Sequence, residues 1–212
     1  MIPRRFPSVT GSARRWCHDR AVEDDRVRWD ARYRDRTPVD AVPPDALRNS
    51  ADARSLLPSG GRAADIACGA GGQTSWLALE GFEVIALDVS PMAVDLVRRA
   101  AEAAGIADRV DARVHDLDDG LPEDVTDLDV LVCQRFRARH LDDDIVSTLR
   151  PGGIAVVTVL SQVGLDIDVG PFHAAPGELV NGLSSSRTDV IYHHEEGGEA
   201  SIVVRRCGDD TP

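Results

Sequence analysis

The sequence predicts a doubly wound α/β fold, built on a mostly parallel, seven-stranded Rossmann-like sheet that ends in an antiparallel hairpin. Between about residues 62 and 160, short apolar runs alternate with segments that carry a helical apolar period. Such alternation requires right-handed crossovers and therefore predicts parallel strands with helices on both faces. After residue 160 the alternation stops, and two strand-like runs flank the turn Glu-Glu-Gly-Gly at residues 195–198, which predicts the hairpin. A glycine-rich turn directly after the first apolar run marks a ligand site at the carboxyl edge of the sheet.

The length of 212 residues, with 42% hydrophobic and 28% charged residues, is typical of one globular domain with an ample core. Residues 1–25 are rich in Arg and lack an apolar period, so we expect a disordered tail there and a single domain over residues 26–208. The net charge of −12 argues against a nucleic-acid partner, which would need a basic face. No apolar run approaches the roughly 20 residues of a membrane span, so no membrane partner is expected.

The cysteines predict the compartment. They show neither paired nor metal-ligand spacing, which is typical of free thiols in a reducing environment. The acidic run at residues 142–144 is expected to cap the helix that follows it rather than to bind a metal. We therefore expect a cytoplasmic protein without a metal site, whose four cysteines are Cys17, Cys68, Cys133 and Cys207.

Two helices are expected before the alternating section. The first spans about residues 23–36 and places Trp29 and Tyr33 one turn apart on the same face. This aromatic pair has two open interpretations: it docks the helix on the domain, or it caps a ligand pocket, and the two are compatible. The second helix is expected over residues 46–57, where a Pro-Ser-Gly-Gly sequence stops it.

The alternating section predicts five strands and three helices. Ser90 and Pro91 supply a side-chain cap and a preferred first residue for the middle helix, and Gly105 ends it. The strands are expected over residues 63–67, 83–87, 110–114, 130–133 and 154–160, and the helices over residues 73–80, 91–104 and 142–149. Beyond them we expect a loop over residues 162–176, a short helix over 177–183, and hairpin strands over 189–194 and 200–206.

The glycine-rich turn has the pattern D-x-x-x-G-x-G-G, which begins at Asp65 and contains Gly69 and Gly71. Glycines let the backbone turn tightly and let a ligand approach the main chain closely. Asp88 ends the next apolar run, where an acid accepts hydrogen bonds from the two hydroxyls of a ribose. The dinucleotide pattern fails because Thr74 stands at its third glycine. The acid before the turn would also repel a pyrophosphate but suits a ligand with an amine and a sulfonium.

This pattern resembles motif I of class I S-adenosylmethionine (SAM)-dependent methyltransferases. The segment Trp29-Asp30-Ala31-Arg32-Tyr33 is similar to the W-x-x-R-Y segment of the tellurite-resistance and thiopurine-type small-molecule methyltransferases. The resemblance covers roughly residues 28–206. It implies an enzyme that uses SAM as cofactor, releases S-adenosyl-L-homocysteine (SAH), acts on a small-molecule acceptor, and is a monomer or homodimer.

The resemblance also implies roles for particular residues. Asp65, Gly69 and Gly71 would hold the methionine moiety and Asp88 the ribose, while the Arg-Pro-Gly-Gly sequence at residues 150–153 would be a structural turn. Val89 would lie beside the adenine, and Asp116 and Leu117 would hold its amine and ring. An acidic stretch such as that around Asp116 is, however, more commonly a solvated loop. The full cofactor-binding set implied is Trp29, Tyr33, Asp65, Cys68, Gly69, Ala70, Gly71, Asp88, Val89, Asp116, Leu117, Cys133 and Gln134.

The acceptor side is expected at residues 134–136 and at Phe172–His173, because both follow strands at the carboxyl edge. Arg135 is the cation of these segments, and its guanidinium can pair with a carboxylate or oxyanion. His173 is the candidate base, because its loop is expected to lie over the pocket. We therefore expect catalytic roles for His173 and Arg135 in an in-line displacement onto a thiol, phenol or carboxylate.

Two other functions stay open at the level of sequence. A fold that binds SAM without turnover would serve as a binding or regulatory module. A nicotinamide-dependent oxidoreductase would share the first strand, turn and helix, but Thr74 and the terminal hairpin count against it.

Overall fold

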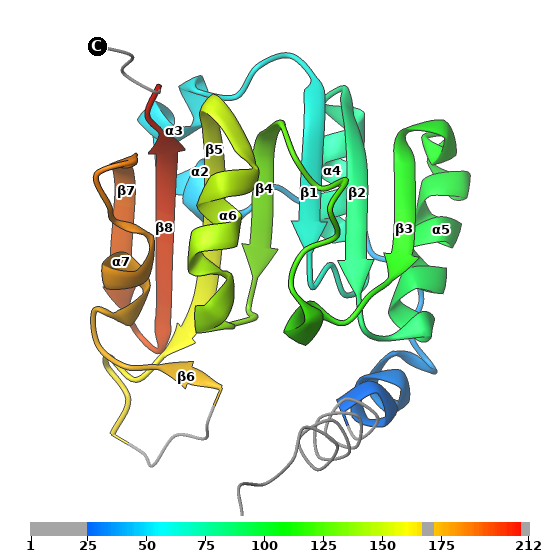
Figure 1. Ribbon diagram of the computed structural model, residues 1–212. Coiled ribbons are helices and arrows are strands. Elements are labelled where there is room, and N and C mark those ends of the chain that lie inside the picture. The colour runs from blue at the N-terminus through cyan, green and yellow to red at the C-terminus, as the bar shows by residue number, and fades with distance from the viewer. Residues whose placement is uncertain (1–24, 167–171, 209–212) are drawn as a thin grey trace, which may run out of the picture.

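The computed structural model describes residues 25–166 and 172–208, so the tail expected over residues 1–25 lies almost wholly outside the described residues. The sheet has the strand order β3-β2-β1-β4-β5-β8-β7, and the first five of these strands in sequence run parallel (Figure 1). β8 pairs antiparallel with β5 and with β7, which confirms the mostly parallel sheet with a closing hairpin. A short eighth strand, β6 (His173–Ala174), pairs with β5 outside this order. The seven strands in the order are β1 (Gly61–Ile66), β2 (Phe82–Asp88), β3 (Val110–Val114), β4 (Leu128–Gln134), β5 (Leu149–Ser161), β7 (Thr188–Glu196) and β8 (Glu199–Arg206).

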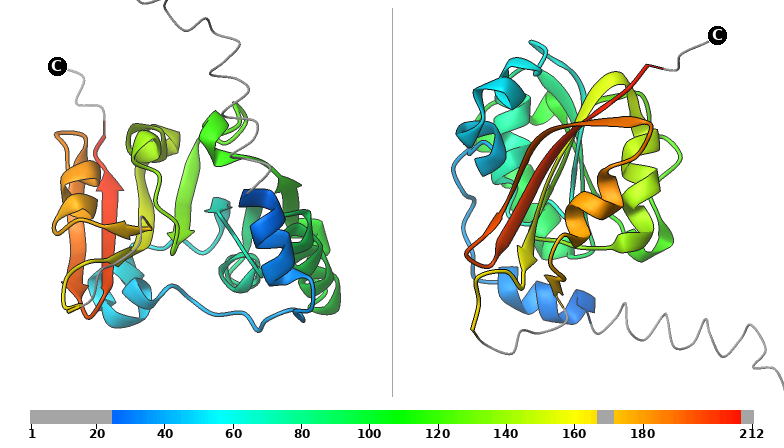
Figure 2. Two further views of the ribbon diagram at one scale, coloured as in Figure 1. Left: turned by 90° about the horizontal axis from the view of Figure 1, so that it is seen from below. Right: turned by 90° about the vertical axis from the view of Figure 1, so that its left-hand side faces the viewer.

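Helices cover both faces of the sheet, as the alternation predicts. The right-hand view of Figure 2 shows the two sets on opposite sides of the strands. Ser90 begins α5 as predicted, because its side chain accepts a hydrogen bond from the N–H of Ala93 at 3.2 Å. On one face lie α2 (Asp45–Asn49), α3 (Ala51–Ser55), α4 (Gly72–Leu79) and α5 (Pro91–Ala103); on the other lie α6 (Asp142–Thr148) and α7 (Glu178–Leu183).

Along the central strands, apolar side chains alternate between two cores, because successive residues of a strand point to opposite faces. Ala63 of β1 packs in the core under α4, and its neighbour Ala64 packs in the core under α6 and α7. Both residues are fully buried. Strands buried on both faces explain why the sequence shows continuous apolar runs rather than strict alternation.

The topology places the site at one edge of the sheet. From β1 the chain winds outward to β2 and β3, and it then returns to the other side of β1 to form β4 and β5. A crevice forms where the direction of winding reverses, outside the carboxyl ends of the strands. The helix over residues 25–33 lies below this edge (Figure 1).

Three expected elements differ from the structure. The helix expected over residues 46–57 is two short helices, α2 and α3. Ser50 between them is extended, and its side chain accepts a hydrogen bond from the N–H of Ala53, so it caps α3 instead of continuing α2. The turn expected at residues 150–153 is part of β5, at a shift of the register with β4. The loop expected over residues 162–176 contains a two-residue strand, β6 (His173–Ala174), which pairs parallel with β5.

In the described part of the chain, no helix is both long enough and apolar enough to span a bilayer.

Candidate functional site

A cavity of about 660 Å³ lies at the carboxyl edge of the sheet, between the strand ends on one side and the helix over residues 25–33 and its following linker on the other. Its volume falls in the range of small-molecule and cofactor sites. The cavity has two halves. The glycine-turn half lies at the ends of β1, β2 and β3, and its lining includes Cys68, Gly69, Ala70, Asp88, Val89, Asp116 and Leu117. The hairpin half lies at the ends of β4 and β5 and the start of β8, and its lining includes Gln134, Arg135, Thr158 and Glu199.

Asp88 is the anchored acid of the glycine-turn half. One carboxylate oxygen accepts a hydrogen bond from the N–H of Gly69 at 2.9 Å, and the other accepts one from the N–H of Ser90 at 2.9 Å. Burial raises the pKa of Asp88, whereas these two amide donors favour the ionised form. Each oxygen keeps a free lone pair, so the carboxylate can accept from two further donors of a ligand.

Asp65 and Gly71 shape the turn from behind and do not line the cavity. Asp65 is 1% exposed and accepts a hydrogen bond from the hydroxyl of Thr74 at 2.6 Å. Burial raises the pKa of Asp65 to about 7. Gly71 has φ 80°, and a Cβ there would lie 2.8 Å from the side chain of Val97 in α5. A side chain at residue 71 would therefore collide with the core rather than fill the cavity.

The N-terminal helix is both docked and turned toward the cavity. Asp30 accepts a hydrogen bond from the hydroxyl of Ser90 at 2.5 Å, which fixes the helix on the start of α5. The rings of Trp29 and Tyr33 stack with centroids 6.0 Å apart, and both line the cavity. The Tyr33 hydroxyl lies close to Gly69, since a Cβ added at Gly69 would be only 2.8 Å from it. Burial raises the pKa of Tyr33 to about 12. The two interpretations of the aromatic pair are thus compatible in this geometry.

Asp116 begins the turn after β3 and has one unused oxygen. Its Oδ1 accepts a hydrogen bond from the N–H of Asp118 at 2.9 Å, whereas its Oδ2 is buried without a partner among the described residues. A buried acceptor without a donor is destabilising unless a ligand or water supplies one. Because Asp116 lines the cavity, its free oxygen fits the amine of a bound ligand.

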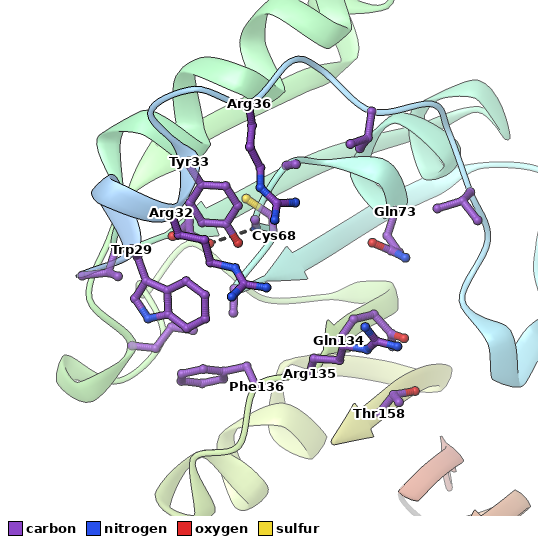
Figure 3. A pocket seen from close by; sticks show the side chains of 18 of the residues that line it. Trp29, Arg32, Tyr33, Arg36, Cys68, Gln73, Gln134, Arg135, Phe136 and Thr158 are labelled. Carbon is purple, nitrogen blue, oxygen red and sulfur yellow. Dashed lines mark hydrogen bonds between the residues drawn. The ribbon is translucent and has the colours of Figure 1, made fainter. Parts of the chain in front are cut away.

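Arg135 and Glu199 bring opposite charges to the hairpin half. Arg135 has φ 59°, and its N–H donates to the carbonyl oxygen of Thr158 at 2.6 Å. Its guanidinium lies 3.4 Å from a carboxylate oxygen of Glu199. Figure 3 shows Gln134, Arg135, Phe136 and Thr158 along the side of the cavity opposite Arg32 and Arg36.

Arg137 lies only two residues beyond Arg135 but does not line the cavity. Its side chain is 10% exposed and forms a bidentate pair with Asp142 at 2.6 and 2.8 Å. It also donates to Glu178, the first residue of α7, at 2.9 Å. These bonds fix the end of the β4 loop to α6 and α7, so the two neighbouring arginines have different environments.

The predicted site residues do not all meet. Gly69 of the glycine turn, Asp88, Asp116, the two N-terminal aromatic residues and Arg135 line one cavity, whereas Asp65 and Gly71 do not. Cys133 is buried beneath it, with its thiol 3.6 Å from the carbonyl oxygen of Phe136. His173 lies in β6, where it pairs with Leu160 of β5, and it is not among the residues that line the cavity.

Several lining residues were not predicted. Gln73 follows the glycine turn, where its position could have identified it. Thr158 and Glu199 carry no local signal, because only the pairing of β5 with β8 brings them to this edge. The unpredicted lining residues are Asp25, Arg32, Arg36, Val39, Val42, Pro43, Asp45, Arg48, Ala67, Gln73, His115, Asp118, Thr158 and Glu199.

Comparisons with known proteins support the class that this fold and site define. Residues 63–153 match the family described as a methyltransferase domain. A ubiquinone biosynthesis O-methyltransferase of Xanthomonas campestris pv. campestris is 30% identical over 140 residues, which are 63% of this chain and 56% of the relative. The chain spans about half the length of the curated relatives it matches.

Solved structures show the same fold. TehB from Haemophilus influenzae has a TM-score of 0.63 at 16% identity, covering 76% of this chain and 61% of that chain. A SAM-dependent methyltransferase from Aquifex aeolicus has a TM-score of 0.58 at 15% identity, covering 72% of this chain and 86% of that chain. The sequence comparisons support a methyltransferase that uses SAM as its cofactor, and the solved structures show the same fold.

The residues of the glycine-turn half fit this cofactor. The anchored carboxylate of Asp88 can accept hydrogen bonds from a ribose, and the free oxygen of Asp116 can accept one from an adenine amine. Gly69 leaves the backbone open beside Tyr33, since a Cβ there would lie 2.8 Å from the tyrosine hydroxyl.

Proposed function

We propose that the protein transfers the methyl group of SAM to a small-molecule acceptor and releases SAH. The observation that carries the proposal is the Asp88 carboxylate, which the N–H groups of Gly69 and Ser90 hold at the mouth of the glycine turn, 2.9 Å from each nitrogen. An acid held in this way can accept hydrogen bonds from both hydroxyls of a ribose. Residues 26–208 form one catalytic domain in this proposal.

In the proposed reaction, the cofactor supplies an electrophilic methyl group on a sulfonium. The chain holds the ribose with Asp88, the adenine amine with Asp116, and the methionine moiety with the turn at Gly69. Trp29 and Tyr33 cover the cavity and exclude water. Positioning of this kind supplies several kcal/mol of barrier reduction, provided the reacting atoms are aligned. The stacked aromatic pair also supports a relationship to the tellurite-resistance and thiopurine-type methyltransferases.

The acceptor in this proposal is a thiol, phenol or carboxylate that enters the hairpin half. Arg135 orients its anionic group, and this role is supported by the position of Arg135 in the cavity lining. A thiolate needs no base, whereas a hydroxyl acceptor requires one. His173 remains the proposed base for a hydroxyl acceptor. Its role has less support than that of Arg135, because His173 lies in β6 outside the cavity lining, whereas Arg135 lines the cavity.

An acceptor-library screen for SAH release tests the proposal. Release of SAH that depends on one acceptor class supports it. Tight binding of SAM and SAH without release with any acceptor would favour the non-catalytic binding module. Binding of NAD in place of SAM would favour the oxidoreductase. We do not expect this result, because Thr74, bonded to Asp65, stands at the position of the third glycine of the dinucleotide pattern.

A further inference from the structure

The ion pair between Arg135 and Glu199 lies across the hairpin half of the cavity. Arg135 follows β4, and Glu199 begins β8, so the pair joins two segments that the sheet brings to the same edge. Both residues line the cavity, together with Thr158 between them in the sheet. The guanidinium and the carboxylate therefore present adjacent opposite charges to any acceptor.

The contact within this pair is weak and replaceable. One guanidinium nitrogen lies 3.4 Å from one carboxylate oxygen, and the Arg135 side chain is 71% exposed. By contrast, Arg137 makes three contacts of 2.6–2.9 Å with its two acids and is 10% exposed. Exposed ion pairs contribute little to stability, so a ligand can separate Arg135 from Glu199 at small cost.

The backbone beneath the pair is fixed. Arg135 adopts φ 59°, a left-handed conformation that is unfavourable for a residue with a Cβ, and its N–H is bonded to Thr158 at 2.6 Å. Thr158 is 2% exposed, and its hydroxyl lies 3.0 Å from the hydroxyl of Ser201. Ser201 lies in β8, two residues after Glu199. The side chains at the surface can therefore exchange partners while their Cα positions stay in place.

We propose that this pair recognises an ammonium and a carboxylate on neighbouring atoms, as in an α-amino acid, so that the acceptor is a zwitterion of this type. The carboxylate of the acceptor binds Arg135 and its ammonium binds Glu199, which replaces one long contact by two charge-assisted ones. Because the guanidinium and the carboxylate lie side by side, they favour a ligand whose two opposite charges are close together. This inference rests on the proposed function and assigns to Glu199 a role in specificity.

The test measures binding of small probes to the protein saturated with SAH. The probes are the common α-amino acids and, for each side chain, the matched amine without the carboxylate and the matched acid without the amine. At least one amino acid is expected to bind about ten- to hundredfold more tightly than both of its analogues, the loss typical of one hydrogen bond to a charged group. Ligand-observed NMR or calorimetry gives the dissociation constants.

Two conservative variants assign the preference to the pair. Glu199→Gln is expected to remove the advantage of the amino acid over the acid, and Arg135→Gln its advantage over the amine. Matched controls are Asp189→Asn and Arg205→Gln, which disrupt an exposed ion pair of 2.7 Å on the same hairpin, outside the cavity. The controls are expected to change no probe affinity, and thermal denaturation checks that all four variants fold.

Three results would overturn the inference while leaving the proposed function intact. The first is that the unaltered protein binds SAH but binds no amino acid more tightly than its matched amine and acid. The second is tighter binding of acids to Glu199→Gln with unchanged binding of amino acids, because the acceptor is then a simple anion that competes with Glu199. The third is a loss of SAH affinity in both variants, because the pair then holds the amino-acid end of the cofactor. Failure of the unaltered protein to bind SAH would overturn the proposed function and this inference with it.

Discussion

The two halves of the cavity are built by different forces. In the glycine-turn half, acids are buried and fixed by short hydrogen bonds, as in the 2.6 Å bond from Thr74 to Asp65 and the 2.9 Å bonds to Asp88. In the hairpin half, an exposed Arg135 and a half-buried Glu199 are joined by one contact of 3.4 Å. A preorganised half suits a ligand that is the same in every turnover, whereas an adaptable, charged half suits the component that differs between related enzymes. Substitutions in the two halves are therefore expected to differ in their effects on stability and on ligand affinity.

The packing behind the glycine turn gives the largest effect. Gly71→Val would place a Cβ 2.8 Å from Val97 at φ 80°, so overpacking and backbone strain add. We expect the free energy of unfolding in urea to fall by about 2–5 kcal/mol. Gly105→Val is the matched control, because Gly105 has φ 69° but nothing within 4 Å of its Cβ position. Equal losses in the two variants would mean that the Val97 contact is unimportant.

Asp88→Ala separates the two halves in ligand binding. The change removes the acceptor for two backbone N–H groups and the proposed ribose contact, so SAH affinity is expected to fall about ten- to hundredfold. Arg135→Ala, in the hairpin half, is expected to leave SAH affinity nearly unchanged. Calorimetry on both folded variants measures the contrast. Similar losses in the two would contradict the division of the cavity.

The pH dependence of stability reports the burial of Asp65. Because its pKa is raised from 3.8 to about 7, the folded state keeps a proton that the unfolded state loses near pH 4. Its contribution is therefore fully present below about pH 4 and is lost as pH rises through 7, by at most about 1.4 kcal/mol per pH unit. Asp65→Asn keeps an acceptor for Thr74 but cannot ionise.

The comparison of native protein and Asp65→Asn at pH 5 and pH 8 checks this expectation. On going to pH 8, the variant should gain stability relative to the native protein in urea unfolding. Parallel pH profiles, or a relative loss at pH 8, would show that Asp65 is ionised in the folded state.

The aromatic pair gives the smallest effect. Trp29→Ala with Tyr33→Ala should weaken SAH binding about two- to tenfold, the contribution expected of aromatic contacts. The docking contact of Asp30 with Ser90 stays intact in this variant, so the helix should remain in place. A fall in melting temperature with normal SAH affinity of the folded fraction would instead support docking as the sole role of the rings.

The sequence predicts the glycine-turn half better than the hairpin half for a physical reason. The turn, Asp65 and Asp88 lie within 24 residues of one another, so their geometry follows from one strand-turn-helix-strand unit. Before this unit, Ser50 shows the limit of periodicity, because its side chain caps α3 and so divides a segment whose apolar pattern predicts one helix. Gly71 was correctly placed in the turn, but its contact with Val97 depends on how α5 packs.

The hairpin half depends on pairing between distant strands. Thr158 and Glu199 are 41 positions apart in sequence, and only the register of β5 with β8 brings them to one edge. His173 illustrates the same limit from the opposite side. Its loop was expected over the pocket, but two residues of that loop pair with β5 and place the histidine outside the lining. The acceptor-facing residues are therefore a property of the tertiary fold rather than of a local motif.

Calorimetric titration of the unaltered protein with SAM, SAH and NAD tests the central claim most directly. We expect saturable one-site binding of SAM and SAH, and no detectable binding of NAD, because Thr74, bonded to Asp65, stands at the position of the third glycine of the dinucleotide pattern. Tight binding of NAD, or no binding of either SAM or SAH, would contradict it.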